Sequence, residues 1–201
     1  MNTIEAVYSR RAVKQFNAGH SLTQDEEHKL LQATIQAPTS FNIQHWRFVI
    51  LRDPELRAKI RKDYGNDQAQ MTDASLLVLF TADMKAWQKR PERYWTDAPK
   101  EVSDLLVNWM GPFHEGREWL QRDEAQRSIG LAMQTMMLVA QEMGYQSCPM
   151  IGFDIDKVAE IIRLPDDFVM GPMVAIGKGM KDPWPKPGQL PLEELVYENS
   201  F

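Results

Sequence analysis

The fold is decided around one stretch, Pro38-Thr39-Ser40-Phe41-Asn42-Ile43-Gln44-His45-Trp46, which joins a helical pattern to a strand-like run at residues 47–51. Pro38 ends the helix, because its ring disfavours helical geometry at the residue before it. The stretch mixes small polar and amide side chains with apolar ones, so it offers hydrogen-bonding groups beside hydrophobic surface. Two interpretations stay open here: a capped connection anchored by Trp46, or a loop that holds a flat aromatic ligand with polar edges.

The helix before this stretch has a distinct start. Thr23 and Glu26 have the spacing of a capping box, in which each side chain accepts a hydrogen bond from the other residue's free N–H group. Small and apolar residues then recur on one helical face, at Leu30, Leu31, Thr34 and Ala37. We therefore predict a helix from about Gln24 to Ala37 that leads directly into the stretch.

Strand and helix patterns alternate along the rest of the chain. Apolar runs predict strands, and capped segments predict helices. The strands lie at 76–80 and 168–177. One helix runs from Pro54 to about Lys62, and another is capped by Asp154 and runs to about Arg163. The run Leu195-Val196-Tyr197 fits an extra strand added to the sheet of a partner. This alternation indicates a mixed α/β or α+β sheet with helices packed on it.

The strongest helical pattern covers residues 123–143. Gly144 follows in the usual place of a helix C-cap. Apolar residues cover more than one stripe of this helix, which indicates burial either at the centre of the domain or against a partner subunit.

Residues 84–122 differ from the rest of the chain. They hold four of the six tryptophans and three prolines, and helical pieces are expected near 99–110 and 115–128. One interpretation is a helical excursion whose aromatic side chains pack onto the body of the domain. The other is a lid or pocket wall that presents aromatic surface to flat substrates.

Bulk composition fits a single globular domain. The 201 residues carry a net charge of −5, which leaves no overall basic field to recruit nucleic acid or an anionic membrane. No run of about 18 apolar residues is present, and early charged residues argue against a secretory signal. The single cysteine, Cys148, fits a reducing compartment. We expect one domain over 1–201, in the cytoplasm, without nucleic-acid or membrane partners.

The N-terminal segment is rich in cations. Residues 3–14 fit a short helix with Ile4 and Val7 on its inner face, followed by Arg10, Arg11 and Lys14. Arg10 and Lys14 are four residues apart, so on a helical backbone they share a face. Arginine's donor fork and lysine's point charge suit a phosphate or an anionic ring edge. Solvated surface cations are the plainer interpretation.

Several kinds of catalytic machinery are missing. The sequence Gly177-Lys178-Gly179 lacks the third glycine and the following helix of a dinucleotide-binding turn, and no Walker-type loop is present. The four histidines lack the paired spacing of a zinc site, so we expect no metal. Cys148 precedes a proline and has no evident base, which favours a buried cysteine over a catalytic thiol.

Three segments together resemble one known family. They are Ser9-Arg10-Arg11-Ala12-Val13-Lys14 with Phe16, the stretch at 38–46, and Cys148-Pro149-Met150-Ile151-Gly152-Phe153-Asp154. In this order, and over essentially the whole chain, they resemble the FMN-dependent nitroreductase family. The Cys-Pro-Met-Ile-Gly-Phe run resembles the one carried by the branch of this family whose members are named NAD(P)H nitroreductases.

The resemblance implies an α+β flavoprotein fold with a central, mostly antiparallel sheet flanked by helices. It also implies a domain-swapped type of homodimer with two FMN sites at its interface, and NAD(P)H as co-substrate. The implied cofactor-binding residues are Arg10, Arg11, Ala12, Lys14, Pro38, Thr39, Ser40, Asn42, Gln68, Pro149, Met150, Ile151, Gly152 and Lys186.

Within this set the resemblance implies distinct roles. Arg10 and Ala12 border the FMN phosphate and ribityl chain, and Lys186 completes the phosphate site. Lys14 lies near the N1/O2 edge of the flavin, where a cation stabilises the reduced, anionic ring. The residues at 38–42 reach the flavin from the other subunit.

The remaining implied contacts come from two turns. Ile151 and Gly152 supply main-chain contacts beside N5 of the flavin. Gln68, in the turn at Asn66 to Gln70, places an amide at the pyrimidine end.

The chain departs from the family pattern at three positions. Ala12 stands where many relatives have serine, which removes a hydroxyl at the phosphate. Ile151 stands where the enteric-type members have an acidic residue, so contacts around N5 come from the main chain. His45 stands in place of the usual proline before Trp46, which leaves the shape of the loop open.

The function that the resemblance implies is ping-pong oxidoreduction, with hydride passing from NAD(P)H through flavin N5 to a flat acceptor such as a nitroaromatic or a quinone. No side chain is required as an acid or base, because the cofactor carries the chemistry. A specialised flavin reductase or dehydrogenase with a narrow substrate is one alternative. A dimeric protein that binds or senses flavin without turnover is another.

Overall fold

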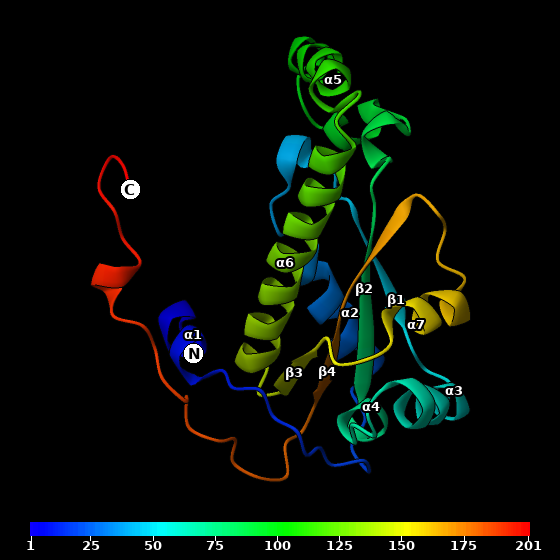
Figure 1. The fold of residues 1–201 in the computed structure, drawn as a ribbon, viewed down its shortest axis with the longest axis vertical. Coiled ribbons are helices and arrows are strands. Elements are labelled where there is room, and N and C mark those ends of the chain that lie inside the picture. Colours follow the sequence, from blue (N-terminus) through cyan, green and yellow to red (C-terminus); the bar gives the residue numbers. More distant parts are fainter.

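A four-stranded antiparallel sheet, ordered β1-β2-β4-β3, forms the centre of the chain (Figure 1). The computed structural model describes residues 1–201. Its strands are β1 (Trp46–Ile50), β2 (Leu76–Asp83), β3 (Gln146–Met150) and β4 (Phe168–Gly177). The two inner strands are the longest, and both were predicted from apolar runs. The predicted α+β fold with an antiparallel sheet flanked by helices is confirmed.

Alternating side chains of β2 divide the core into two layers. Val78 and Phe80 pack with α2 (Gln24–Thr34) and α6 (Glu118–Glu142) on one face of the sheet. Leu77 and Leu79 pack on the other face, with α3 (Pro54–Lys59), α4 (Gln70–Asp73) and α7 (Ile155–Ile162). Because successive strand residues point to opposite faces, burial on both sides explains why every residue of β2 is buried.

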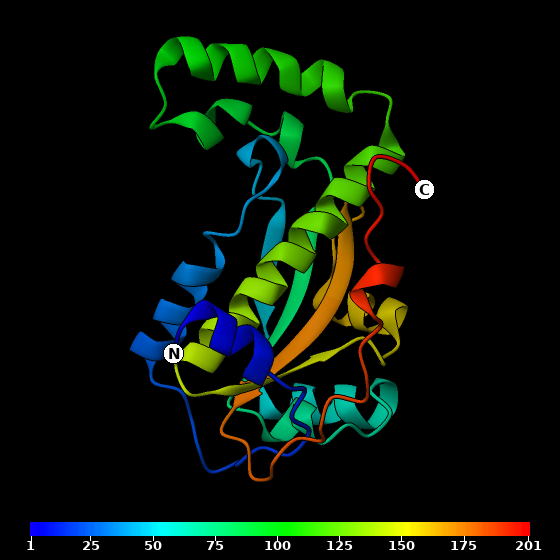
Figure 2. The same cartoon turned by 90° about the vertical axis from the view of Figure 1, so that its left-hand side faces the viewer.

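Helix α6 is the central helix of the domain and covers one face of the sheet (Figure 2). Ile129, Ala132, Met136 and Ala140 are fully buried against the strands, so this helix is buried centrally within its own chain. The expected helical pieces at 115–128 and 123–143 are one continuous helix of 25 residues. It ends where Gly144 takes a φ of 77°, a left-handed conformation that glycine adopts without steric cost.

The capping signals in the sequence are confirmed. Thr23 and Glu26 form the full capping box of α2, and the Asp154 side chain accepts from the Lys157 N–H at the start of α7. Asp53 caps α3, whose continuation from Ile60 to Tyr64 is a π-helical turn that was not predicted. Insertion of one extra residue per turn is typical of functional positions in helices.

The excursion carries α5 (Lys100–His114) across one end of the molecule (Figure 2). It packs onto the loop after Pro38 through a small apolar cluster that contains Ile43, Tyr94 and Met110. Trp109 and Trp119 remain 57% and 64% exposed, so the excursion both packs on the body and leaves aromatic surface outside.

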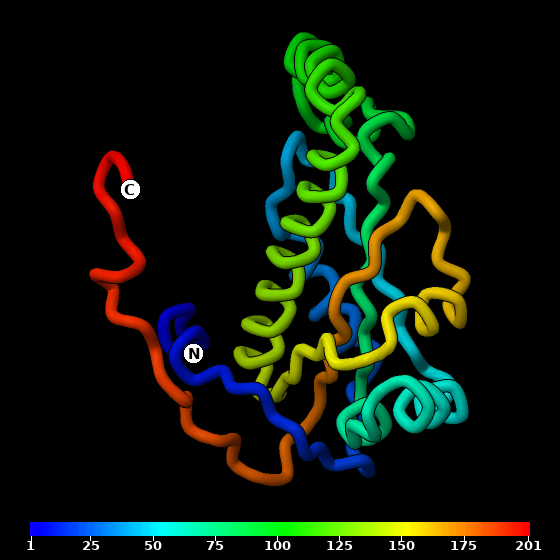
Figure 3. The backbone as a smooth tube through the Cα atoms, viewed as in Figure 1, coloured from blue at the N-terminus to red at the C-terminus, as the bar shows by residue number.

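The two ends of the chain run along the same side of the domain (Figure 3). Helix α1 (Thr3–Ser9) packs against α6, and the C-terminal tail after Met180 contains only a short 3-10 helix, Leu192–Glu194. In this chain the predicted strand at 195–197 is not formed. None of the helices combines the length and apolar character required to span a bilayer.

The predicted inner face of the N-terminal helix is wrong. Ile4 and Val7 are 66% and 41% exposed, and Ala6 is the residue that is buried. The helix ends at Ser9, because Arg10 takes an extended ψ of 131°. Arg10 and Lys14 therefore do not share a helical face. They follow one another on an extended segment.

Candidate functional site

The extended segment after α1 lies against the outer edge of the sheet. The Val13 N–H donates to the Ser147 carbonyl at 3.0 Å, and Ala12 forms a parallel bridge with Ser147. Val13 is buried, while Ala12 and Lys14 on either side of it are exposed, and Phe16 is buried further along the segment. Residues 12–14 thus alternate with the period of a strand, and the pairing with Ser147 holds the cationic segment beside β3.

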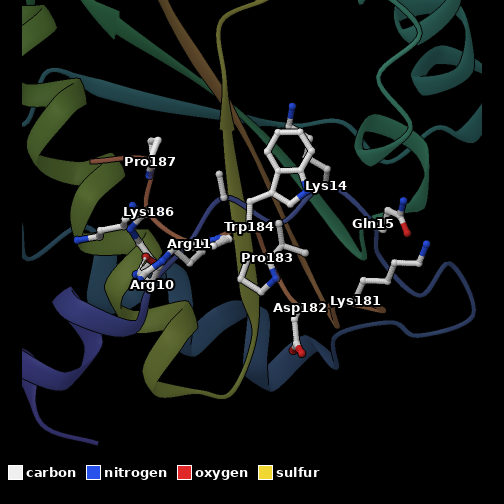
Figure 4. Close-up of a pocket in the computed structure, with 13 residues that line it drawn as sticks. Arg10, Arg11, Lys14, Gln15, Lys181, Asp182, Pro183, Trp184, Lys186 and Pro187 are labelled. Atoms are coloured by element: carbon white, nitrogen blue, oxygen red, sulfur yellow. Dashed lines mark hydrogen bonds between the residues drawn. The ribbon is translucent and has the colours of Figure 1, made fainter. Parts of the chain in front are cut away.

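A cavity of about 430 Å³ lies between this segment and the first part of the tail (Figure 4). Residues 10–15 line one side and residues 181–187 the other. Its five basic side chains and one acidic side chain are Arg10, Arg11, Lys14, Lys181, Lys186 and Asp182. None of the five cations takes part in a salt bridge of this chain. A cationic cavity on a chain of net charge −5 selects anions.

The two adjacent arginines of the cavity are used differently. Arg11 Nη1 donates to the carbonyls of Tyr8 and Arg10 at 2.6 and 2.9 Å, so this guanidinium closes the end of α1. Arg10 Nη1 is buried and has no hydrogen-bond partner. A buried donor without a partner is costly, and an anion in the cavity would satisfy it. Lys186 reaches the same region, with Nζ 5.9 Å from the Tyr8 ring centre.

The turn after β3 presents its main chain to solvent. Pro149 and Met150 lie on β3, whereas Ile151 is 69% exposed and Gly152 is also exposed. The Ile151 carbonyl accepts from the Phe153 N–H at 2.9 Å, and the Gly152 carbonyl accepts two side-chain amides. The N–H groups of Ile151 and Gly152 have no hydrogen-bond partner in the chain. The turn therefore offers free donors to a ligand.

Gln68 lies beside this turn. Its Nε2 donates to the Gly152 carbonyl at 2.8 Å and to the Gly65 carbonyl at 3.1 Å, and its Oε1 accepts from Gln70. The amide is thus committed to the protein. A contact between Gln68 and a cofactor stays a prediction.

The loop at 38–42 lies at the other end of the domain, beneath α5, and does not line the cavity (Figure 2). Its polar groups are held internally. Thr39 Oγ1 accepts from the Gln44 N–H at 3.0 Å, and Asn42 Nδ2 donates to the Tyr94 carbonyl at 2.7 Å. Phe41, Asn42 and Gln44 have φ values of 51°, 55° and 52°, so the loop is tightly bent. Pro38, Thr39, Ser40 and Asn42 therefore do not meet the cationic segment within one chain.

His45 anchors this loop from inside. Trp46 is buried on β1, as the connection interpretation predicted, and His45 beside it is fully buried. Burial lowers the pKa of His45 to about 4, with the charges of His114 and Arg47 acting in the same direction. Burial also lowers the pKa of His114. Both rings are therefore neutral at pH 7, and His45 anchors the loop through a hydrogen bond between its Nδ1 and Ser128 Oγ.

The thiol of Cys148 is a core group. The side chain is buried on β3, and burial raises its pKa despite the opposing influence of Lys14, Gln70 and Arg10. A thiolate is the reactive form of cysteine, so this raised pKa argues against a nucleophile. The sequence-based preference for a buried cysteine agrees with this geometry.

Some residues of the site were not identified from the sequence. Lys181 and Trp184 line the cavity, and Trp184 is 86% exposed. The sequence carries a signal for them, because a proline stands on each side of Trp184 and a lysine lies beyond each proline. Prolines favour an extended backbone, which here carries cationic and aromatic side chains. The sequence favours Gln68 as the amide of this turn, whereas in the structure Asn66 reaches the same carbonyl.

Comparisons with known proteins agree with this geometry. The model of the nitroreductase family matches residues 7–178. Protein DrgA of Synechocystis is 59% identical over 98% of this chain and 95% of its own length. MhqN of Bacillus subtilis, provisionally named an NAD(P)H nitroreductase, is 33% identical over 86% of each chain.

Solved structures share the fold over its full length. A provisionally named NAD(P)H:FMN oxidoreductase of Staphylococcus epidermidis has a TM-score of 0.90 and 25% identity, over 98% of this chain and 95% of its own. A provisionally named nitroreductase of Exiguobacterium sibiricum, solved in complex with FMN, has a TM-score of 0.89 and 25% identity, over 98% and 97%. The chain belongs to the nitroreductase family.

Proposed function

We propose that this chain is an FMN-dependent NAD(P)H oxidoreductase that acts by a ping-pong mechanism on a flat acceptor such as a nitroaromatic or a quinone. Family membership and the names of the relatives support the class of reaction. Bound FMN supplies the hydride-accepting ring, and the protein supplies binding, orientation and electrostatics.

One observation carries the proposal: the buried Arg10 Nη1 has no partner and borders a cavity with four further cations. An FMN phosphate provides acceptor oxygens for a guanidinium fork, and charge-assisted hydrogen bonds of this kind are strong. Arg10 and Lys186 hold the phosphate. Arg11 closes the end of α1 and keeps the backbone of the segment in place.

Lys14 and the turn at 151–152 interact with the flavin ring. Lys14 lies on the exposed side of the segment and lines the cavity, so its ammonium group places positive charge where reduction adds negative charge. The free N–H groups of Ile151 and Gly152 donate to the edge of the ring that accepts hydride. Neither role requires a side chain that gains or loses a proton during the reaction.

A second subunit completes the site. Because the loop at 38–42 does not line the cavity of its own chain, Pro38, Thr39, Ser40 and Asn42 serve the FMN of the partner. Exposed apolar side chains along the tail support a paired state, since Leu192, Leu195, Val196 and Tyr197 are each more than half exposed. The homodimer accordingly has two sites.

FMN binding by the Arg10→Gln variant tests whether the unpaired guanidinium of Arg10 binds the phosphate. Arg122→Gln is the matched control, because the Arg122 side chain is 64% exposed on α6 and lies outside the cavity. We expect the dissociation constant for FMN to rise about 10- to 100-fold in Arg10→Gln, as lost charge-assisted hydrogen bonds imply, and to stay unchanged in the control. Equal affinity of the wild type and Arg10→Gln contradicts the phosphate site.

A further inference from the structure

Two side-chain amides converge on one carbonyl at the exposed turn. Asn66 Nδ2 and Gln68 Nε2 donate to the Gly152 carbonyl at 2.9 and 2.8 Å. The donors lie 86 and 84 residues before their acceptor in the sequence. A carbonyl has two lone pairs, so the two amides satisfy it completely. Nothing in the secondary structure requires this, because Gly152 lies outside every helix and strand.

The segment that carries these amides has an unusual backbone. It begins with the π-helical turn at 60–64, whose last residue, Tyr64, accepts from the Asp154 N–H at 2.8 Å. Asn66 and Asp67 then both take a φ of 52°, a conformation that is costly for residues other than glycine and less so for Asn and Asp. These constraints aim both amides at the turn after β3.

Gly65 permits this arrangement. A Cβ atom at Gly65 would lie 2.5 Å from Met71 Sδ and 2.9 Å from the Ile60 carbonyl oxygen, so only glycine lets the π-helical turn close against α4. Gln70 then donates to Gln68 Oε1 at 3.1 Å and fixes the orientation of that amide. The Gly152 carbonyl is thus held by Gln68, whose amide is oriented by Gln70, and by Asn66, whose left-handed backbone directs its amide.

Fixing a carbonyl of this turn determines where the N–H group of the following residue points, because the two groups share a planar peptide unit. The Ile151 carbonyl is held by Phe153 and the Gly152 carbonyl by the two amides, while the N–H groups of Ile151 and Gly152 remain free. The Gly152 carbonyl shares its peptide plane with the Phe153 N–H that holds the Ile151 carbonyl, and the Ile151 carbonyl shares its plane with the Gly152 N–H. If the Gly152 carbonyl were released, the Phe153 N–H would lose its alignment, and rotation of the Ile151–Gly152 peptide would turn the Ile151 carbonyl toward the site in place of the Gly152 N–H. A donor favours a ring nitrogen that carries a lone pair, and a carbonyl favours one that carries hydrogen.

We propose that Asn66 and Gln68 are positioning residues that act through the Gly152 carbonyl. Through these two peptide planes they keep the Gly152 N–H directed at the hydride-accepting edge of FMN, which stabilises the oxidised cofactor and lowers its midpoint potential. This inference rests on the proposed function. It gives the two amides a role through the protein main chain, in contrast to a direct contact with the flavin.

The test compares the wild type with Asn66→Gly, Gln68→Leu and the double variant. Glycine keeps the left-handed conformation at position 66 while it removes the amide. Leucine keeps most of the volume of Gln68. Two matched controls are available: Asn199→Gly, at a φ of 68° in the tail, and Gln126→Leu, which removes an amide that donates to the Met170 carbonyl at 3.1 Å.

The first measurement is the midpoint potential of bound FMN, from anaerobic spectroscopic titration against reference dyes. We expect it to rise in both single variants, because each removes one of the two hydrogen bonds to the carbonyl, and most in the double variant, which removes both. The controls keep the wild-type potential. The second measurement is amide hydrogen exchange of residues 150–154 in the protein without FMN, which we expect to be about 5- to 10-fold faster in the double variant.

The outcomes separate the two claims. A wild type that is bleached by NAD(P)H, together with an unchanged potential and unchanged exchange in the double variant, overturns the positioning role alone. A wild type that takes up no FMN overturns the proposed function and this role with it. If the double variant does not fold, the midpoint potentials of the two single variants test the positioning role. An unchanged potential in both of them overturns it.

Discussion

His45 Nδ1 lies 3.0 Å from Ser128 Oγ, in a contact that joins the 38–46 loop to the central helix α6. Ser128 Oγ donates its proton to the Glu124 carbonyl at 2.7 Å, so it accepts from His45, and the proton of the neutral ring is on Nδ1. His45 Nε2 is left buried without a partner, as is His114 Nε2. A proton added at Nε2 would place an unpaired charge in the core.

Stability should therefore fall in mild acid. The pKa of His45 is about 4 in the folded chain and 6.5 when unperturbed, so between these values the unfolded chain binds a proton that the folded chain does not. The free energy of unfolding should decrease as pH falls from 6.5 to 4, by about 3 kcal/mol in total. His114 contributes in the same direction.

Urea unfolding at a series of pH values checks this. His45→Asn, which retains a donor for Ser128, should lose most of the slope between pH 6.5 and 4, and His28→Asn, at an exposed position on α2, should keep it. If the free energy of unfolding depends on pH in the same way in the wild type and in His45→Asn, His45 is not the source of the loss of stability in acid.

Lys14 should tune the cofactor. Replacing Lys14 with alanine removes a cation that lines the cavity and has no ion-pair partner in the chain. We expect weaker FMN binding and slower reduction by NAD(P)H, each by about tenfold, because a hydrogen bond to a charged group contributes about 1.5–3 kcal/mol. Fluorescence titration and anaerobic stopped-flow absorbance measure the two effects, with exposed Lys29→Ala as the control. If FMN affinity and reduction rate both stay unchanged, the role of Lys14 is wrong.

The two halves of a site should come from different subunits. Arg10→Gln damages one half, and Ser40→Leu, in the loop that does not line its own cavity, damages the other. Each variant alone should bind little FMN. In a mixed dimer, one site carries both substitutions and the other carries neither, so random mixing should restore about a quarter of the sites.

Co-refolding of the two variants and counting of bound FMN by absorbance measure this recovery. Mixing each variant with itself is the control. Binding that does not rise above the sum of the separate variants argues for a site built within one chain.

Gly171 should be intolerant of a side chain. It lies on β4 where α6 crosses, and a Cβ atom there would be 2.9 Å from Ile129 Cγ2 and 3.0 Å from the Phe80 carbonyl oxygen. Gly171→Ala should destabilise the fold by about 1–3 kcal/mol through overpacking. Gly130 in α6 is the matched control, since a Cβ atom there meets nothing within 4 Å, and Gly130→Ala should stabilise by about 0.5–1 kcal/mol. Thermal unfolding of both variants distinguishes these directions.

Local signals in the sequence predicted the body of the fold well. The capping box at Thr23, the cap at Asp154 and the strand at 168–177 all lie where the structure has them. Each depends on chemistry within a few residues, such as a hydroxyl that satisfies a free N–H group or an apolar run that is buried on both faces.

Features set by long-range packing were predicted less well. Ile4 and Val7 have helical spacing but are exposed, because the turn of α1 that meets α6 carries Ala6. The π-helical turn at 60–64 depends on the close contact of Gly65 with Met71, which no local pattern reveals. The assignment of 1–201 as one domain, the cytoplasmic location and the roles of the individual site residues stay predictions.

The most direct test of the account is anaerobic titration of the purified protein with NADH and with NADPH, followed by the flavin absorbance. We predict that the protein carries or takes up yellow FMN, that at least one nicotinamide bleaches it, and that a quinone or nitroaromatic added afterwards restores the colour. Protein that takes up no FMN, or bound FMN that neither nicotinamide bleaches, would contradict the account, and the latter would favour a protein that binds or senses flavin without turnover.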